Sequence, residues 1–156
     1  MTNNFLTKEG FQKLQDELGS AQVVPLDPTS GTFTTRVNGS ATYPGSFLDS
    51  GSNAFYFSAA FPNCRSDAIF HCPASSQTLS AQNQGFSGPP SMVSFQVANA
   101  DVLFSSHPGF FAFNNLAGHG TNGGFDWGLP FFYGRNVYTA IDGRSTPGGT
   151  GPYIAY

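Results

Sequence analysis

Residues 47–52 combine residue types that can support acid–base chemistry. Two apolar residues lead directly into Asp49, which is followed by Ser50, Gly51 and Ser52. A carboxylate at the end of an apolar strand is costly to bury unless hydrogen bonds satisfy it. Gly51 allows a tight turn that brings backbone amides close to the carboxylate, and the two serines add hydroxyl donors. We therefore take these four residues as candidate catalytic residues, although a strand that merely ends in a polar turn would use the same residue types.

A β-hairpin is predicted to deliver Asp49 to the end of a strand. Residues 32–37 alternate between apolar and polar side chains, and the following Asn-Gly pair at 38–39 is preferred in two-residue type I′ turns. Residues 41–48 then return along the first strand and end at Asp49. A catalytic loop would lie at this strand end.

The composition predicts a folded, mainly β protein with a single β domain. Charged residues make up 10% of the 156 residues and aromatic residues 15%, with 19 glycines and 11 prolines. Chains that stay disordered are poor in aromatic residues, and few Lys and Glu beside many Phe, Tyr and Thr favour strands. The net charge of −3 gives no electrostatic reason to expect nucleic acid. We expect no membrane span, because no apolar run is long enough, and no cofactor or metal.

Several further elements are expected along the chain. Residues 98–104 predict a short helix or turn with Asp101 as a candidate cap. The histidines at 71, 107 and 119 fall in predicted loops, form no arrangement with a serine or cysteine, and are expected to be solvated. Strands are predicted at residues 23–24, 54–57, 78–83, 92–97, 110–117, 138–142 and 153–156.

Cys64 and Cys72 are predicted to form one small disulfide. They lie eight residues apart in a loop-like stretch, and a disulfide would place the domain in an oxidising compartment. The alternatives are two reduced thiols or a metal pair with His71, although zinc sites usually bring four ligands in paired short spacings. No apolar segment of signal-peptide type follows Met1. Either the chain is a fragment of a longer exported protein, or the disulfide prediction is wrong.

Residues 1–18 differ from the rest and predict a helical leader. An amphipathic helix is expected over 7–18, with Thr7 as its N-cap and Gly19 as its stop. Its apolar residues at helical spacing are Phe11, Leu14 and Leu18. The segment resembles the opening of the Gre transcript-cleavage factors, in which a coiled-coil hairpin follows. No coiled coil follows here, so we carry over no Gre function and expect an appended leader before one domain at 19–156.

Two stretches resemble the aspartic proteases. The order apolar–apolar–Asp–Ser–Gly–Ser at 47–52 resembles their active-site loop. Residues 125–143 resemble the closing segment of a pepsin lobe, in which two apolar residues and a glycine precede an aromatic-rich turn and a strand. Gly128 matches that glycine and follows Trp127, and it lets the segment pass close beside the Asp-bearing loop. Asp126 stands where the pepsin pattern has an apolar residue. The resemblance implies a pepsin/retropepsin-like closed β-barrel lobe, supported at its site by Gly128 and Trp127.

The domain at 19–156 also resembles the C-terminal half of an uncharacterised family of exported bacterial proteins. That resemblance implies export to the periplasm, the cell surface or the extracellular space. It also implies an earlier half with its own Asp-Thr-Gly, which this chain lacks. The residues that carry it are 47–53, 72–74, 94–101, 113–118, 125–135 and 145–153.

Acid proteolysis requires two carboxyl groups that share one proton. Asp49 would be one of them, but the chain holds no second Asp-Ser/Thr-Gly. The pairs at 126–127 and 142–143 lack the hydroxyl–glycine pattern. We therefore expect a missing N-terminal lobe or a homodimer partner to supply the second carboxyl, with a peptide as substrate. The alternative is a non-catalytic exported module, for binding or structure, on the same fold.

Overall fold

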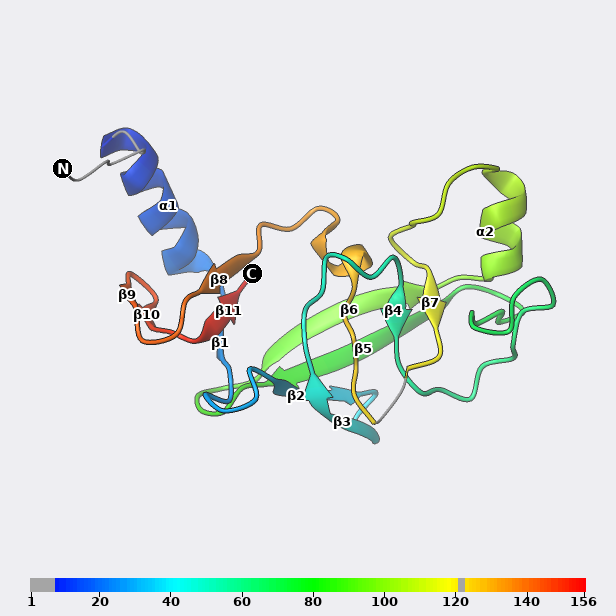
Figure 1. Ribbon diagram of the computed structural model, residues 1–156, viewed down its shortest axis with the longest axis horizontal. Helices are drawn as coiled ribbons and strands as arrows, with labels where there is room; N and C mark the ends of the chain where they lie inside the picture. The colour runs from blue at the N-terminus through cyan, green and yellow to red at the C-terminus, as the bar shows by residue number, and fades with distance from the viewer. Residues whose placement is uncertain (1–7, 121–122) are drawn as a thin grey trace.

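Short strands and tight turns make up most of the regular structure (Figure 1). The computed structural model describes residues 8–120 and 123–156, apart from the side chains of residues 8, 11 and 14. In chain order the elements are α1 (Lys8–Ser20), β1 (Val23–Pro25), β2 (Phe33–Val37), β3 (Ala41–Ser46), β4 (Phe55–Tyr56), β5 (Gln77–Gln84), β6 (Ser91–Val97), α2 (Ala100–Ser106), β7 (Ala117–Gly118), the 3-10 helix η1 (Leu129–Phe132), β8 (Tyr138–Ala140), β9 (Ser145–Thr146), β10 (Gly149–Thr150) and β11 (Tyr153–Ala155).

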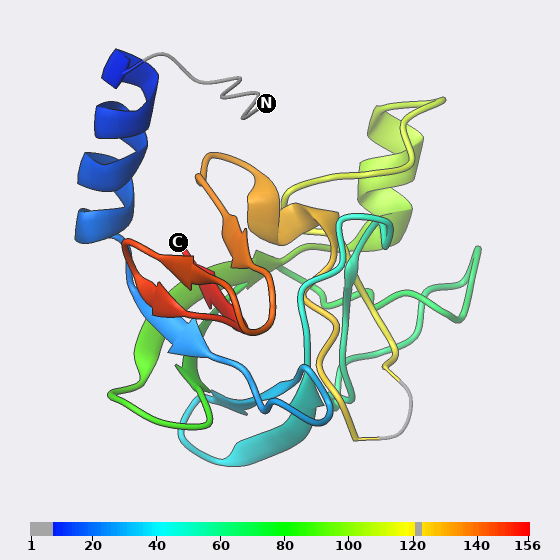
Figure 2. The same ribbon diagram turned by 60° about the vertical axis from the view of Figure 1, so that its left-hand side comes forward.

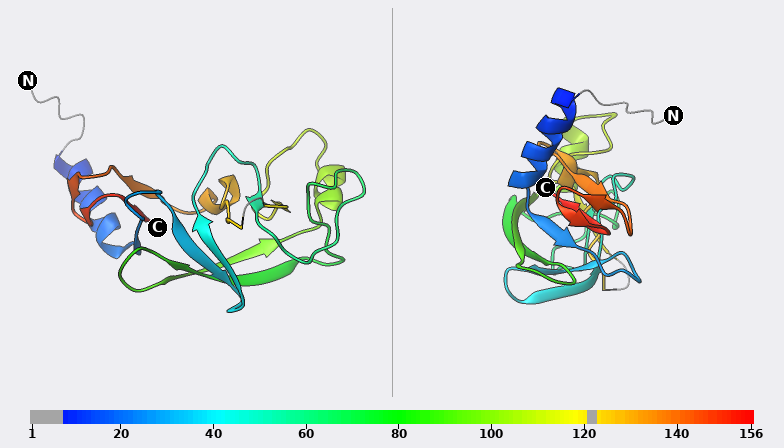
Figure 3. Two further views of the ribbon diagram at one scale, coloured as in Figure 1. Left: turned by 60° about the horizontal axis from the view of Figure 1, so that its bottom comes forward. Right: turned by 90° about the vertical axis from the view of Figure 1, so that its left-hand side faces the viewer.

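A four-stranded antiparallel sheet with the order β3-β2-β5-β6 contains the predicted hairpin. Asn38 and Gly39 both adopt positive φ, at 47° and 70°, as a type I′ turn requires. The seven residues of β6 alternate strictly between buried and exposed positions. Figure 3 shows the long β5–β6 hairpin running between the two ends of the molecule. The predicted strand at 92–97 is confirmed. The hairpin turn at Asn38-Gly39 is also present, but three residues, 38–40, separate the paired Val37 and Ala41, where two were predicted.

A second sheet, with the order β1-β11-β8, lies beside α1 at one end of the molecule (Figure 2). Leu18 of α1 is buried in a small apolar cluster with Ala140, Tyr153 and Ala155. The Tyr138 hydroxyl donates a 2.6 Å hydrogen bond to the Glu17 carboxylate. The helix therefore packs on the sheet through its last turns.

The predicted leader ends earlier in the chain than α1 does. The helix continues through Gly19 to Ser20, so the predicted boundary between residues 18 and 19 falls inside it. The predicted cap, Thr7, lies outside the described residues. No helix within the described ranges combines the length and hydropathy that a bilayer crossing requires.

The main core is built from stacked aromatic rings. The ring centroid of Phe125 lies 4.3 Å from that of Trp127 and 4.6 Å from that of Phe57, and both pairs are stacked. Phe55 meets Trp127 edge to face at 5.6 Å. All four side chains are buried. This cluster fixes the segment at 125–127, on which the candidate site depends.

The expected closed barrel is absent from the parts of the chain that the structure describes. The strands instead divide into separate sheets of three, two, four and two strands. The ladders are interrupted where Pro25, which has no backbone N–H, ends β1, and where the register shifts between Phe33 and Thr35. The fold is therefore mainly β, as predicted, but not a closed barrel.

Two local predictions around α2 were wrong. The N-cap is Asn99, whose side-chain oxygen accepts a 3.1 Å hydrogen bond from the Val102 amide. Asp101 points to another loop instead. The strand expected at 110–117 shrinks to the two residues of β7, because the preceding aromatic rings pack beside α2, as in the contact of Phe104 with Phe113 at 5.8 Å.

Candidate carboxylate site

The loop after Phe47 holds the Asp49 carboxylate with two donors. Oδ1 accepts a 2.8 Å hydrogen bond from the Gly51 amide, and Oδ2 accepts a 2.8 Å bond from the Ser52 hydroxyl. Ser50 is exposed at the turn. A Cβ on Gly51 would lie 3.1 Å from Oδ1, so a larger residue there would press on the carboxylate. The loop is therefore shaped around the carboxylate by Gly51 and Ser52.

Residues 125–127, the crossing segment, lie between the residues that lead into this loop, at Phe47, and those that lead out of it, at Tyr56. On the entering side, the Phe47 amide donates to the Phe125 carbonyl at 3.0 Å, and the Trp127 amide donates to the Phe47 carbonyl at 3.0 Å. On the leaving side, Tyr56 and Asp126 exchange two backbone hydrogen bonds of 2.9 Å. The pairing is parallel with Phe47 and antiparallel with Tyr56. Both arms of the Asp49 loop are thus held by one segment.

Gly128 brings this segment into direct contact with the loop. A Cβ on Gly128 would lie 2.0 Å from the Ala54 carbonyl oxygen and 3.1 Å from that of Ser52. The Leu129 amide then donates a 2.6 Å hydrogen bond to the Ser52 carbonyl. The structure therefore brings Gly128 against the loop that bears the candidate residues 49–52, with Ser52 as the one that the segment contacts.

Trp127 anchors the crossing segment from the opposite side. Its ring is fully buried, and its Nε1–H donates a 3.0 Å hydrogen bond to the Thr35 hydroxyl on β2. The Thr35 hydroxyl in turn donates to the side-chain oxygen of Asn83 on β5, at 2.8 Å. Trp127 thus ties the segment to the four-stranded sheet and does not itself face the carboxylate loop.

Asp126 is the residue that the sequence prediction set aside. Its Oδ1 accepts a 2.8 Å hydrogen bond from the Gly128 amide, and its carboxyl also interacts with the Ser52 hydroxyl. Burial raises the pKa of Asp126, and the charge of Asp49 raises it further, while the Ser52 and Gly128 donors oppose the rise. The structure therefore places two carboxyl groups around one serine hydroxyl.

The sequence contained a signal for this placement. Alternate residues of an extended segment lie on the same face. Gly128 was already expected beside the Asp49 loop, so Asp126, two residues earlier, belonged beside it as well. The search for a second Asp-Ser/Thr-Gly missed Asp126 because that residue reaches the loop from a different segment.

A cavity of about 260 Å³ opens beside Asp126. The Tyr56 hydroxyl donates a 2.7 Å hydrogen bond to the Asn53 side chain, and burial, followed by the charge of Asp126, raises the pKa of this phenol. The residues that line the cavity are Phe47, Tyr56, His119, Gly120, Gly124 and Asp126. The carboxyl of Asp126 therefore has open space for a small group beside it.

Asn53 links the carboxylate loop to an aromatic loop after α2. Its side-chain amide donates a 2.5 Å hydrogen bond to the Phe111 carbonyl. The side chains of Phe110 and Phe111 are 62% and 73% exposed, which is unusual for phenylalanine. Apolar surface thus lies in the loop that is fastened to residues 49–53.

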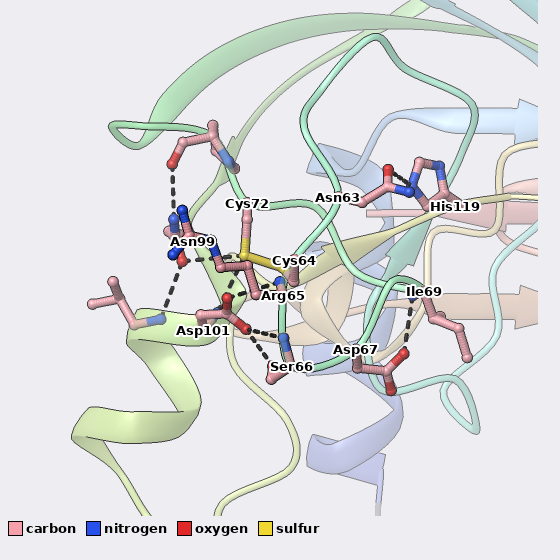
Figure 4. Close-up of a disulfide and its surroundings, with 12 residues drawn as sticks. Asn63, Cys64, Arg65, Ser66, Asp67, Ile69, Cys72, Asn99, Asp101 and His119 are labelled. Atoms are coloured by element: carbon pink, nitrogen blue, oxygen red, sulfur yellow. Dashed lines mark hydrogen bonds between the residues drawn. A yellow bond between two sulfur atoms is a disulfide. The ribbon is translucent and has the colours of Figure 1, made fainter.

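The predicted disulfide is confirmed and lies apart from the carboxylates (Figure 4). Cys64 and Cys72 are bonded to each other, so neither supplies a thiolate to a metal. Figure 4 shows Asp101 reaching across to the same loop, where it accepts a 3.0 Å hydrogen bond from the Arg65 amide and further bonds from Ser66. These hydrogen bonds lower the pKa of Asp101, with the Ser66 hydroxyl as the largest cause.

His71 was expected to be solvated, and that expectation was wrong. Its ring is fully buried, with Nε2 3.3 Å from the Phe57 carbonyl and the ring centroid 4.3 Å from that of His119. Burial lowers the pKa of His71, which favours the neutral ring. His119 is half-buried and contacts the Asn63 side chain at 2.8 Å. The histidine pair fills space next to the cavity.

The fold and site define a mainly β protein with an intrachain disulfide and a hydrogen-bonded carboxylate loop. The family model described as "Protein of unknown function (DUF3443)" matches residues 12–156, so the chain belongs to this uncharacterised family. No curated protein and no solved structure matches the chain. The family match begins inside α1, and the disulfide is compatible with an extracellular location.

Proposed function

We propose that this chain is an aspartic-peptidase-like lobe in which Asp49 is the ionised carboxylate that activates water. The observation that carries the proposal is the crossing of the Asp49 loop by residues 125–127, with Gly128 against Ala54. A glycine-bearing segment in contact with an Asp-Ser-Gly loop is what the resemblance to a pepsin lobe implies.

The chemistry follows from the donors around Asp49. A carboxylate that accepts bonds from the Gly51 amide and the Ser52 hydroxyl is held in one orientation. It would take a proton from a water molecule as the water oxygen attacks a peptide carbonyl. A second, protonated carboxyl would polarise that carbonyl. In the form expected from the sequence, a further lobe or a second copy of the chain would supply this second group.

The substrate of this proposal is a peptide with apolar side chains near the scissile bond. Phe110 and Phe111 expose aromatic surface in the loop that Asn53 fastens to the carboxylate loop. Burying such surface against an apolar substrate side chain would contribute binding free energy of roughly 25 cal/mol per Å². Export of the protein, also proposed, would bring it into contact with extracellular peptides.

The test is a peptide-cleavage assay at acid pH on the wild-type chain and on Asp49→Asn. Loss of the base should lower kcat at least about 100-fold. Asp142→Asn, which removes an exposed carboxyl from the segment after β8, is the matched control and should cleave like the wild type. Undiminished cleavage by Asp49→Asn would remove Asp49 from the mechanism.

A non-catalytic module is the second candidate, and one observation favours it. Both oxygens of Asp49 are already occupied by donors from its own loop, much as the exposed Asp27 accepts from the amides of Thr29 and Ser30 in a turn. Under this alternative, the wild-type chain cleaves no peptide at any acid pH. Asp49→Asn would then lower the free energy of unfolding and have no other effect.

A further inference from the structure

We infer that Asp126 is the second carboxyl of the Asp49 site, so that a single chain holds both acid–base groups around the Ser52 hydroxyl. This inference rests on the proposed function and changes its requirement for a partner. Neither a further lobe nor a second copy of the chain is then needed to complete the pair.

The backbone fixes where Asp126 stands. It pairs with Phe47 on one side and with Tyr56 on the other, so it is held by both arms of the loop. Phe47 is two residues before Asp49 in an extended segment, and alternate residues share a face. The Asp126 carboxyl is further oriented by the Gly128 amide at 2.8 Å. The backbone of Asp126 is thus held on two sides, and its carboxyl is held by one amide.

The single proton of the Ser52 hydroxyl distinguishes the Asp49 carboxyl from the Asp126 carboxyl. The hydroxyl has one proton, and it donates that proton to Asp49 Oδ2 at 2.8 Å. As a donor, Ser52 would lower the pKa of Asp126, but the single hydroxyl proton is already given to Asp49. The Ser52 hydroxyl therefore serves Asp49, which leaves Asp126 as the carboxyl of the pair that keeps its own proton. Burial and the Asp49 charge, which raise the pKa of Asp126, favour the same assignment.

The surroundings of Asp126 leave room for a reacting group. The cavity of about 260 Å³ is lined by Asp126 together with the exposed edge of Phe47 and the ring of Tyr56. The titratable groups nearest to Asp126 are Asp49 and the Tyr56 phenol, and the cavity also carries His119. A peptide carbonyl in this space would meet the acid group of the pair.

Hydrolysis of the peptide bond needs only water and the two carboxyl groups. The water oxygen bonds to the carbonyl carbon, and the water proton goes to Asp49. The π electron pair moves to the carbonyl oxygen, which takes the proton of Asp126 and forms a gem-diol. On collapse the C–N bond breaks, and the nitrogen keeps the electron pair and takes the proton from Asp49. One hydroxyl of the gem-diol becomes the carbonyl of the new acid and returns its proton to Asp126.

The experiment uses the full chain and compares the wild type with Asp49→Asn, Asp126→Asn and the control Asp142→Asn. At acid pH, both site variants should lose at least about 100-fold in kcat with little change in KM. The wild-type rate per chain should not change with protein concentration, because one chain is sufficient. Asn can still accept the hydrogen bond from the Gly128 amide, and circular dichroism checks that the variant is folded.

A titration distinguishes a reacting group from a merely structural one. Carboxyl carbon NMR should follow the titration of Asp126 in the wild-type chain and in Asp49→Asn. Asp49→Asn should lower the pKa of Asp126, because one neighbouring charge is gone. An Asp126 pKa that is the same in Asp49→Asn as in the wild type would overturn the inference, even if Asp126→Asn were inactive.

The remaining outcomes separate the inference from the proposed function. Cleavage that needs Asp49, persists in Asp126→Asn and rises per chain with concentration would overturn the inference and leave the proposed function standing, with a second copy as the source of the other carboxyl. Absence of cleavage by the wild-type chain at any concentration would overturn the inference, because one chain would then not be sufficient, and would leave the proposed function only in the form in which a further lobe supplies the second carboxyl.

Discussion

Gly128 lies directly against the carbonyl oxygen of Ala54, so closely that a Cβ on Gly128 would come within 2.0 Å of that oxygen. Its φ of 43° is also in the region that side-chain-bearing residues rarely adopt. This contact is what brings the crossing segment onto the carboxylate loop, so the geometry of the site depends on the absence of a side chain here.

Gly128→Ala should therefore be strongly destabilising. Backbone strain and overpacking together should lower the free energy of unfolding by about 3–5 kcal/mol, as measured by urea denaturation. Gly45→Ala in β3 is the matched control, because a Cβ there meets nothing within 4 Å and its φ is not positive. That control should lie within about 0.5 kcal/mol of the wild type. Equal stability of the two variants would show that the segment does not pack as described.

Trp127→Phe tests the anchor on the other side of the crossing segment. The change removes buried ring volume and the 3.0 Å hydrogen bond to the Thr35 hydroxyl. We expect a loss of about 2–3 kcal/mol in the free energy of unfolding, again from urea titration. The exposed Phe111→Leu serves as its control, with a change below about 0.5 kcal/mol. A near-wild-type Trp127→Phe would mean that the ring is not fully buried.

The features that the sequence predicted well have local physical causes. The hairpin depends on Asn38 and Gly39, because few other residue pairs adopt positive φ at two successive positions. The disulfide depends on two cysteines that lie close together in one loop. The donors to Asp49 come from residues two and three positions later in the chain. Each of these interactions is encoded within a few residues, so pattern and spacing are sufficient.

The features that could not be predicted from the sequence depend on contacts between distant segments. Asp126 is 77 positions after Asp49, and only the crossing segment brings them together. His71 is buried because Phe57, Phe61 and His119 pack around its ring. The closed barrel was expected from the family resemblance alone, and no local pattern shows whether strand ladders join. Periodicity carries no information on such pairings.

Removal of the disulfide should lower stability by an amount set mainly by its short loop. For the eight-residue separation of Cys64 and Cys72, the loss of loop-closure entropy is about 2–3 kcal/mol. The double variant Cys64→Ser/Cys72→Ser should show this decrease in the free energy of unfolding. Reductant should have the same effect on the wild type and none on the variant. A wild-type chain that is insensitive to reductant after full reduction, shown by thiol labelling, would contradict the prediction.

The stability of the folded chain should depend on pH through Asp126. Burial, with the charge of Asp49 adding to it, raises the pKa of Asp126 above its ordinary value of 3.8. Between 3.8 and the raised pKa, the folded chain keeps a proton that the unfolded chain has already released. The contribution of Asp126 is therefore fully present below pH 3.8 and is lost as the pH rises through the folded-state pKa.

An asparagine side chain cannot ionise, so the Asp126→Asn variant should not lose this contribution to the free energy of unfolding as the pH rises. Its free energy of unfolding should match that of the wild type to within about 0.5 kcal/mol below pH 3.8. Above that pH the variant should become progressively more stable than the wild type, and the difference should level off once Asp126 is fully ionised in the folded chain. Urea midpoints measured across this range give the two curves. Parallel curves, or a variant that becomes less stable as the pH rises, would mean that Asp126 ionises as easily in the folded chain as in the unfolded one.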